Sequence, residues 1–373
     1  MSYGLRRMTE RIEWVTTRRR LDALRPQWDL LARGPFQRHG WFTAWWESFS
    51  ASRKLAVCAL WREEELVGVL PLCGRRGSLE VMANVHSPLF EPLSKDPPAL
   101  DAVLRASVAG ARGRLTLTPV PSDGPVFERC VAAAREAGRL VWIEPGEISP
   151  IADTTGKFAT YREPRKRAWR ELERRRRRLL REHSPTVRLI ERPVDLEGEL
   201  SRGFALEARG WKGRNGTAIL STEQTRRFYT AAARTFHASG EFVVSSIEVD
   251  GCLLAWDLAL LEGDRYWLLK TAYDERHRSL APGLVLRHQV IEHCFQRGLR
   301  AHEFLGGAMD WKLSFATGQR AHAAIRAYRR RPPSMLSYLS RRFARPPAAR
   351  AYHRLRPPRS GRSPARSEPA SRG

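Results

Sequence analysis

Five residues in the last part of the second half of the chain have side chains that could move protons or polarise a carbonyl. Lys270 and Tyr273 lie in the strand-like run RYWLLKTAY, Glu303 lies in the run RAHEFLGG, and Asp310 and Lys312 follow it. A carboxylate such as Glu303 or Asp310 can act as a general base. A lysine or a tyrosine can polarise a carbonyl or protonate a leaving thiolate. Simple ion pairs at strand ends would use the same residue types.

A loop before an expected helix is a second place for chemistry. The run LVLRHQVIEHCFQRG predicts a helix over Leu284 to Gly298, preceded by the loop DERHRSLAPG. A helix N-terminus presents free backbone N–H groups to an anion such as a pyrophosphate, and a glycine there allows close approach. The residues that could surround this anion are Arg276, Arg278, Ser279, Leu280, Ala281 and Gly283. A plain turn has a similar composition.

The segment LEARGWKGR contributes a third group, Glu207, Trp211 and Lys212. A spacing of four places Glu207 and Trp211 on one helix face if the helix continues through Gly210. These residues could line an acceptor pocket. Alternatively, Trp211 is buried and its indole N–H donates to a carboxylate.

Other chemistry receives little support. His288 and His293 are five residues apart and no HExxH motif occurs, so no metal is expected. No GxSxG motif is present, and Cys252 and Cys294 fall inside an expected strand and helix, where a free cysteine usually packs. Covalent catalysis is therefore not predicted.

The net charge of +25 is concentrated in two segments. Residues 162–181 carry a net charge of +8 and residues 329–373 carry +12, so the rest of the chain is only mildly basic. A continuous basic face for nucleic acid is not indicated. The five cysteines form no CxxC pair and no run approaches the length of a spanning helix, which predicts a cytoplasmic protein that is not transmembrane.

In the second half, three strand-like runs are separated by turns. EFVVSSIEV, CLLAWDLALL and RYWLLKTAY alternate with Asp250-Gly251 and Gly263-Asp264, which predicts an antiparallel meander. The helix over Leu284 to Gly298 and the strand RAHEFLGG follow. Upstream, the arginine-rich segment 162–182 predicts a long helix between the halves.

The first half begins with an aromatic group at mostly helical spacing, from Trp28 to Phe49, which predicts a helix packed on a sheet. The runs at 55–61 and 66–72 predict a hairpin, followed by a strand at 115–120, a helix at 127–137 and a strand at 140–143. We expect one domain over 1–150, a second over 151–328 that includes the arginine-rich helix, and a basic, largely disordered tail over 329–373 with a short helix near 335–343.

Several of these segments resemble one known family. LEARGWKGRNGTAI, LLKTAYDERHRSLAPGLVL and HEFLGGAMDWK are similar to GNAT-type acyltransferases of the CelD-like, FemAB-related group, as are GVLPL and HSPLFEPL in the first half. Together they cover roughly residues 25 to 325. The resemblance implies an α/β fold of two GNAT-like units in tandem, each a mainly antiparallel sheet flanked by helices.

The same resemblance implies the donor and the reaction. It implies acetyl-CoA or another acyl-CoA as co-substrate, bound at Arg278 to Gly283, and transfer to an amine or hydroxyl, for example on an envelope or polysaccharide precursor. The glycine-rich loop of simple GNAT enzymes is reduced here to RSLAPG, which retains only the last glycine.

Two alternatives stay open. A FemAB-like transferase would take an aminoacyl group from charged tRNA and use the arginines at 174–178 as phosphate contacts. A non-catalytic protein would instead bind polyanions or a membrane surface through its basic segments. A measurement of donor preference would test the first alternative, and deletion of residues 329–373 would test the second.

Overall fold

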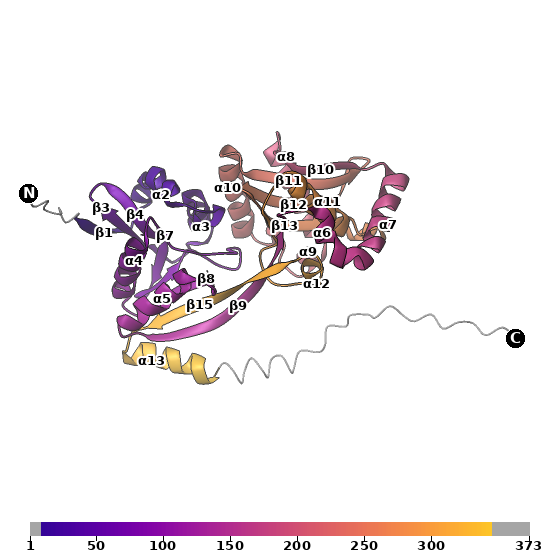
Figure 1. Ribbon diagram of the computed structural model, residues 1–373. Helices are drawn as coiled ribbons and strands as arrows, with labels where there is room; N and C mark the ends of the chain where they lie inside the picture. The colour runs from indigo at the N-terminus through magenta and orange to yellow at the C-terminus, as the bar shows by residue number, and fades with distance from the viewer. Residues whose placement is uncertain (1–8, 345–373) are drawn as a thin grey trace, which may run out of the picture.

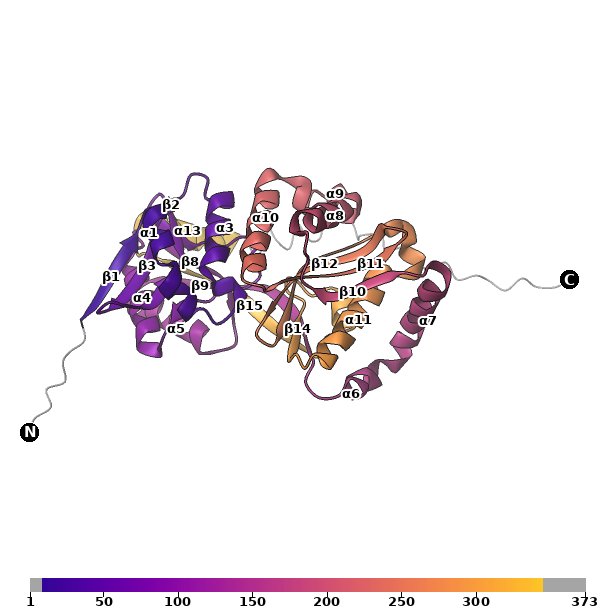
Figure 2. The same ribbon diagram turned by 90° about the horizontal axis from the view of Figure 1, so that it is seen from above.

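The computed structural model describes residues 9–344 and confirms the expected α/β fold class (Figures 1 and 2). Two sheets are flanked by helices, and the two halves of the chain, residues 9–153 and 154–344, lie side by side. Within the described residues, no helix is both long and apolar enough to cross a membrane.

The first half contains a four-stranded sheet, short strands, and five helices. Its strands are β1 (Glu10–Val15), β2 (Lys54–Leu55), β3 (Val57–Arg62), β4 (Glu65–Leu70), β5 (Leu72–Arg75), β6 (Ser78–Val81), β7 (Leu93–Ser94), β8 (Arg114–Pro121) and β9 (Leu140–Asp153). Its helices are α1 (Arg18–Ala23), α2 (Arg25–Leu31), α3 (His39–Phe49), α4 (Pro97–Gly110) and α5 (Pro125–Glu136), with a 3-10 turn at Pro35–Gln37.

The second half contains the arginine-rich helix and the meander. Its helices are α6 (Phe158–Arg162), α7 (Lys166–His183), α8 (Leu196–Arg209), α9 (Trp211–Arg214), α10 (Glu223–Ala238), α11 (Pro282–Gln296), α12 (Asp310–Leu313) and α13 (Pro332–Leu339). Its strands are β10 (Thr186–Glu191), β11 (Phe242–Val249), β12 (Cys252–Glu262), β13 (Arg265–Tyr273), β14 (Ala301–Glu303) and β15 (Gly318–Tyr328). Short 3-10 turns lie at Glu163–Arg165, Ile219–Ser221 and Glu275–Leu280, and a π-helical turn lies at Ser340–Ala344.

The order of elements repeats between the halves. Apart from the short strands β2, β6 and β7, the first half runs from β1 through helices α1–α3 to β3, β4 and β5, then α4, β8, α5 and β9. The second half runs from β10 through α8–α10 to β11, β12 and β13, then α11, β14, α12 and β15. The repeat is consistent with two related units in tandem.

The final strands of the two units are exchanged. In the eleven-stranded sheet, β9 pairs with β14 of the second unit, and β15 pairs with β8 of the first unit. The two exchanged strands also pair with each other along most of their length, from Gly318 opposite Ile151 to Tyr328 opposite Leu140. Figure 1 shows them crossing together from one half to the other. The boundary expected at residue 150 therefore lies inside β9.

The meander has the turn that its sequence predicts. Asp250 and Gly251 both have positive φ, 49° and 73°, which is the requirement of the two-residue turn that best joins twisted antiparallel strands. Strands β11, β12 and β13 pair antiparallel as expected. The hairpin of β3 and β4 is likewise confirmed.

Part of the aromatic group of the first half packs against a helix of the other half. Trp41 on α3 is buried, and its ring lies 5.0 Å from that of Phe228 and 6.4 Å from that of Phe236, both on α10. Their burial removes a large apolar area from water at the junction of the two halves.

Some local predictions were wrong. The strand expected at 140–143 is longer than predicted, because β9 continues through the prolines at 145 and 150 to Asp153. The strand expected over RAHEFLGG is limited to Ala301–Glu303. The short helix near 335–343 forms at Pro332–Leu339, and the disorder expected from 345 onward lies outside the described residues.

Candidate functional site

Two neighbouring parallel strands separate near their ends. Strands β13 and β14 pair only from Arg265 to Trp267 against Ala301 to Glu303. Beyond that point β13 continues to Tyr273, whereas the chain after β14 turns away at Leu305 and Gly306, which both have positive φ. The segment 268–273 therefore has no partner in β14 and lines a cavity.

The same segment contains a β-bulge. Leu258 on β12 lies opposite Lys270, but the next residue, Ala259, lies opposite Leu268, so Leu269 is the extra residue. A bulge leaves its extra residue out of the ladder and re-aims the side chains beside it. Leu269 and Lys270 both line the cavity.

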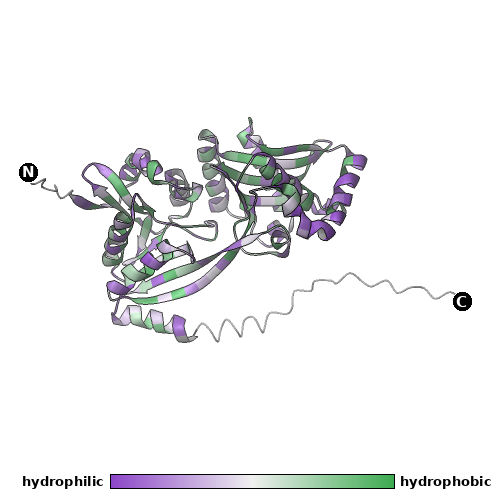
Figure 3. Ribbon diagram, in the orientation of Figure 1, coloured by the Kyte–Doolittle hydropathy of each residue, from purple (hydrophilic) through white to green (hydrophobic). Residues whose placement is uncertain are grey.

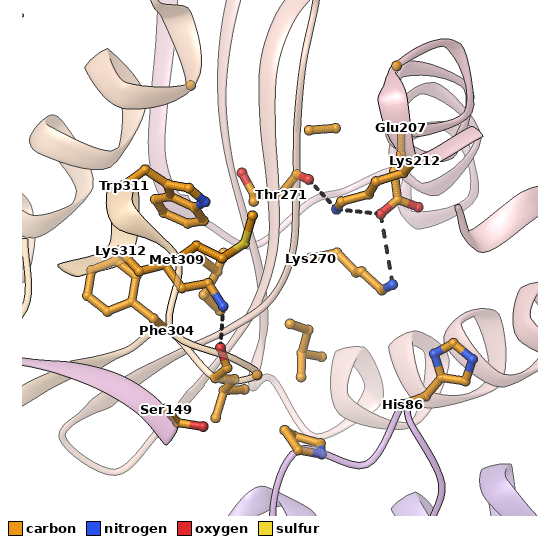
Figure 4. A pocket seen from close by; sticks show the side chains of 18 of the residues that line it. His86, Ser149, Glu207, Lys212, Lys270, Thr271, Phe304, Met309, Trp311 and Lys312 are labelled. Carbon is orange, nitrogen blue, oxygen red and sulfur yellow. Dashed lines mark hydrogen bonds and ion pairs between the residues drawn. The ribbon is translucent and has the colours of Figure 1, made fainter. Parts of the chain in front are cut away.

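The cavity has a volume of about 980 Å³ and lies between the two halves. The first half contributes residues 84–88, Thr118 and Pro119, and the exchanged strands contribute Gly146, Glu147, Ser149 and His322. The second half contributes the end of α8, α9, the segment 268–273, the start of α11 and the segment around α12. Figure 4 shows the side chains of some of the residues that line it.

A buried ion cluster forms one wall of the cavity. Lys212 Nζ donates to Glu207 Oε1 at 2.8 Å and to the carbonyl of Thr271 at 2.7 Å. Lys270 Nζ lies 3.9 Å from the same Glu207 oxygen and 4.8 Å from the centre of the Tyr229 ring (Figure 4). The other carboxylate oxygen, Oε2, accepts the backbone N–H of Ile219 at 2.7 Å.

Burial lowers the pKa of both lysines in this cluster. For Lys212 and Lys270 alike, loss of water around the ammonium is the largest cause, and the Glu207 carboxylate opposes it. A lysine with a lowered pKa can release its proton more readily, which suits proton transfer.

The three residues expected to line an acceptor pocket do line the cavity, but not by the expected geometry. Helix α8 ends at Arg209, and Gly210 is extended with φ of −83° and ψ of −170°, so the helix does not continue to Trp211. Trp211 is 40% exposed, and Glu207 bonds Lys212 and Ile219 instead of an indole. The alternative of a buried, carboxylate-bound tryptophan was therefore wrong.

His86 reaches the cavity from the first half. Its ring stacks on Phe49 at 5.6 Å, and its nitrogens lie 3.4 Å from Thr225 Oγ1 and from Tyr229 Oη. Burial, with the nearby Lys270 charge, lowers the pKa of His86 to about 4, so the ring is neutral at neutral pH. No role was predicted for His86 from the sequence, although it begins the family-like run HSPLFEPL.

Lys312 lies across the cavity from this cluster. Its ammonium donates to the carbonyls of Leu305 and Gly307 and therefore ties α12 to the turn that follows β14 (Figure 4). Burial lowers the pKa of Lys312 to about 8. Lys270, Tyr273 and Lys312 are thus the expected catalytic residues that line the cavity.

The two expected carboxylate bases lie elsewhere. Glu303 is fully buried and pairs with Arg265 at 2.6 Å and with Arg320 at 2.9 Å, so it holds β13, β14 and β15 together. Asp310 is exposed in the first turn of α12. Neither lines the cavity, whose carboxylates are Glu147, Glu207 and Glu275.

The expected anion loop is only partly at the cavity. Arg278, Ala281 and Gly283 line it, whereas Ser279 does not and Leu280 is buried in the core. Arg276 is also outside, with its guanidinium bonded to Asp274, and this bond lowers the pKa of Asp274 to about 2.

The start of α11 offers one backbone donor to an anion. Pro282 has no N–H, and the N–H groups of Leu284 and Val285 donate to the carbonyl of Ala281. The backbone N–H of Gly283 is therefore the group that can donate to an anion. A Cβ on Gly283 would lie 3.3 Å from the Tyr273 ring, so the backbone approaches that ring closely.

The described residues include no group of three or more His, Cys, Asp or Glu side chains that could hold a metal ion.

Comparison with known proteins agrees with this geometry. Residues 165–313 match the family model described as Acetyltransferase (GNAT) domain. That segment contains α7 to α12, including the separating strands β13 and β14 and the start of α11. No curated protein matches the sequence.

Solved structures share the fold over most of the chain. FemX is 14% identical with a TM-score of 0.54, and the similarity covers 88% of this chain and 99% of that one. L-PGS from Bacillus licheniformis is 11% identical with a TM-score of 0.51, over 87% and 96%. A conserved protein of unknown function from Bacteroides thetaiotaomicron is 13% identical with a TM-score of 0.50, over 86% and 100%. Residues 165–313 are thus similar to GNAT acetyltransferase domains, and the chain as a whole shares its α/β fold with FemX.

Proposed function

We propose that this chain is an acyltransferase that moves an acyl group from acyl-CoA to an amine or hydroxyl in the cavity between the halves. The separation of β13 from β14 carries the proposal. This separation leaves the edge of β13 open to the extended, thioester-bearing part of acyl-CoA. The open edge ends beside the start of α11, where Gly283 and Arg278 can bind the pyrophosphate of acyl-CoA. The match of residues 165–313 to a GNAT domain supports this donor.

The reaction needs four changes of bonding. The acceptor nucleophile attacks the thioester carbonyl, the carbon–sulfur bond breaks, the nucleophile loses a proton and the thiolate gains one. We assign proton transfer to Lys270 and Lys312, since both line the cavity and burial lowers the pKa of each. The bulge at Leu269 is the place where backbone could face the developing oxyanion.

Glu207 has a positioning role in this proposal. Its carboxylate fixes Lys212 and faces Lys270, so it sets where positive charge lies in the cavity. Acceptor recognition is assigned to Glu207, Lys212 and Trp211 together with His86.

Calorimetric titration of the full-length chain with acetyl-CoA and with a longer acyl-CoA tests the donor. Gly283→Asp places a carboxylate beside the single free N–H, whereas Gly283→Ala adds the same Cβ without charge. We expect saturable binding by the wild type and by Gly283→Ala, and at least about tenfold weaker binding by a folded Gly283→Asp. Absence of binding by the folded wild type would reject a CoA donor.

One observation favours a second donor. Arg167, Arg170, Arg174, Arg177 and Arg181 share the exposed face of α7, and Arg175 of the same helix lines the cavity. A charged tRNA could lie along this face with its aminoacyl end in the cavity. In a filter-binding assay, this alternative requires charged tRNA to bind wild type and to bind Arg170→Gln/Arg177→Gln more weakly.

A further inference from the structure

Helix α13 turns its polar side toward the protein. It lies against β9 and β15, and Ser334, Ser337 and Tyr338 are its partly buried positions. The Tyr338 ring packs edge-on against Tyr328 at 5.7 Å, and Arg341, just after the helix, lies 3.5 Å from Glu144. These contacts fix the rotation of the helix about its axis.

The apolar side of α13 therefore faces solvent. Met335, Leu336 and Leu339 are 42%, 68% and 42% exposed. Their spacing of one and four residues places them on one helix face. A helix on a protein surface normally buries its apolar stripe, so the orientation here is reversed. Figure 3 shows the hydrophobic residues of α13 in green, with hydrophilic residues in purple near its ends.

Positive charge surrounds this apolar face. Arg329, Arg330 and Arg331 precede the helix, and Arg341 and Arg342 follow it. The remaining sequence, residues 345–373, adds eight arginines and a single acidic residue, Glu368. Helices that lie in the interface of an anionic bilayer typically combine arginines with leucine and methionine side chains that face away from the protein.

We propose that α13, together with the arginines that flank it at positions 329–331 and 341–342, docks the protein on an anionic lipid surface. The apolar residues would enter the boundary between headgroups and acyl chains, and the arginines would pair with lipid phosphates. Self-association through this face is disfavoured because two copies would bring their arginine clusters together. A nucleic acid would engage the arginines through its phosphates and would leave the leucines unused.

The docking surface does not depend on acyl transfer. None of Met335, Leu336 and Leu339 lines the cavity, and α13 packs on the parts of β9 and β15 that lie beside the first half of the molecule. Loss of docking and loss of donor binding are therefore separable.

Co-sedimentation of the full-length chain with lipid vesicles tests the proposal. Vesicles of phosphatidylcholine alone are compared with vesicles of phosphatidylcholine mixed with phosphatidylglycerol. Leu336→Ser/Leu339→Ser removes two of the three apolar side chains of this face without touching a buried residue. The control, Leu30→Ser/Val194→Ser, removes two apolar side chains elsewhere on the surface that are more exposed still.

We expect binding to the anionic vesicles only, at least about tenfold weaker for Leu336→Ser/Leu339→Ser, and unchanged for the control. Circular dichroism confirms that each variant is folded. Wild-type binding that does not depend on phosphatidylglycerol, or a Leu336→Ser/Leu339→Ser variant that binds like wild type, overturns the proposal. Tighter binding to a single-stranded RNA oligonucleotide than to the vesicles, unchanged in this variant, also overturns it and assigns the flanking arginines to nucleic acid.

Discussion

Lys212 and Glu207 form a buried ion pair across the break between α8 and α9, with 2.8 Å between Nζ and Oε1. Glu207 is buried and Lys212 is partly buried, and the pair is completed by the Thr271 carbonyl and the Ile219 N–H. Since every strong donor and acceptor in the group has a partner, the group fixes one wall of the cavity.

Removing the Glu207 carboxylate should destabilise the fold. Glu207→Ala leaves the Lys212 ammonium buried without its counter-charge, and this typically costs about 3–5 kcal/mol. Glu207→Gln keeps an acceptor and should cost less. Urea unfolding monitored by tryptophan fluorescence measures both. Equal stability of Glu207→Ala and wild type would contradict the role of the pair.

Lys312 should make stability depend on pH above neutrality. Its pKa is about 8 in the folded chain and 10.5 as a model value, so between these values the unfolded state binds more protons. Stability from this group therefore rises with pH across that window, by at most about 1.4 kcal/mol per pH unit. Lys312→Met should remove this part of the slope when unfolding is measured at pH 8, 9 and 10. A slope identical to that of wild type would contradict the lowered pKa.

His86 should make stability depend on pH below neutrality. Its pKa is lowered to about 4 from 6.5, so as pH falls from 6.5 the unfolded state takes up a proton that the folded ring refuses. Stability from this group therefore falls between pH 6.5 and 4 and is constant above pH 6.5. His86→Gln should remove this part of the dependence of stability on pH. NMR titration of the ring protons gives an independent value, and a pKa near 6.5 would show that the ring is solvated.

The pair of Asp257 and Arg287 should couple strongly. Arg287 on α11 bonds Asp257 on β12 at 2.5 Å, both are almost fully buried, and Arg287 also contacts His302 on β14. Each single change, Asp257→Leu or Arg287→Met, leaves one buried charge alone and should cost about 3–5 kcal/mol. The double variant should cost clearly less than the sum of the two. Additive costs in a double-mutant cycle would mean that the charges do not stabilise each other.

The sequence predicted the local elements of the second half better than the site they build. Asp250-Gly251 and the alternating runs around it specify the meander through local turn chemistry and period-two burial. The segment 268–286 was therefore placed correctly as strand, loop and helix. The donor, the acceptor and the CelD-like subgroup stay predictions.

The rest depends on contacts that are distant in sequence. His86 and Lys270 line one cavity although 184 positions separate them. Glu303 carries a carboxylate that could act as a base. Its pairing with Arg265 and Arg320, however, depends on the register of β13, β14 and β15. Strand β15 has two partners, β8 and β9, and its mixed run GQRAHAAIRAY shows no clean alternation.

The exchange of β9 and β15 has a consequence for how ligands enter the cavity. Both strands run through the junction of the halves and are hydrogen-bonded to each other across it, so rotation of one half against the other would have to bend a paired ribbon. We therefore expect little hinge motion. Access to the cavity should depend instead on rearrangement of the loop segments beside it, residues 84–88 and 305–309. The distance between the segment 268–273 and the residues 84–88 would then change without movement of the halves.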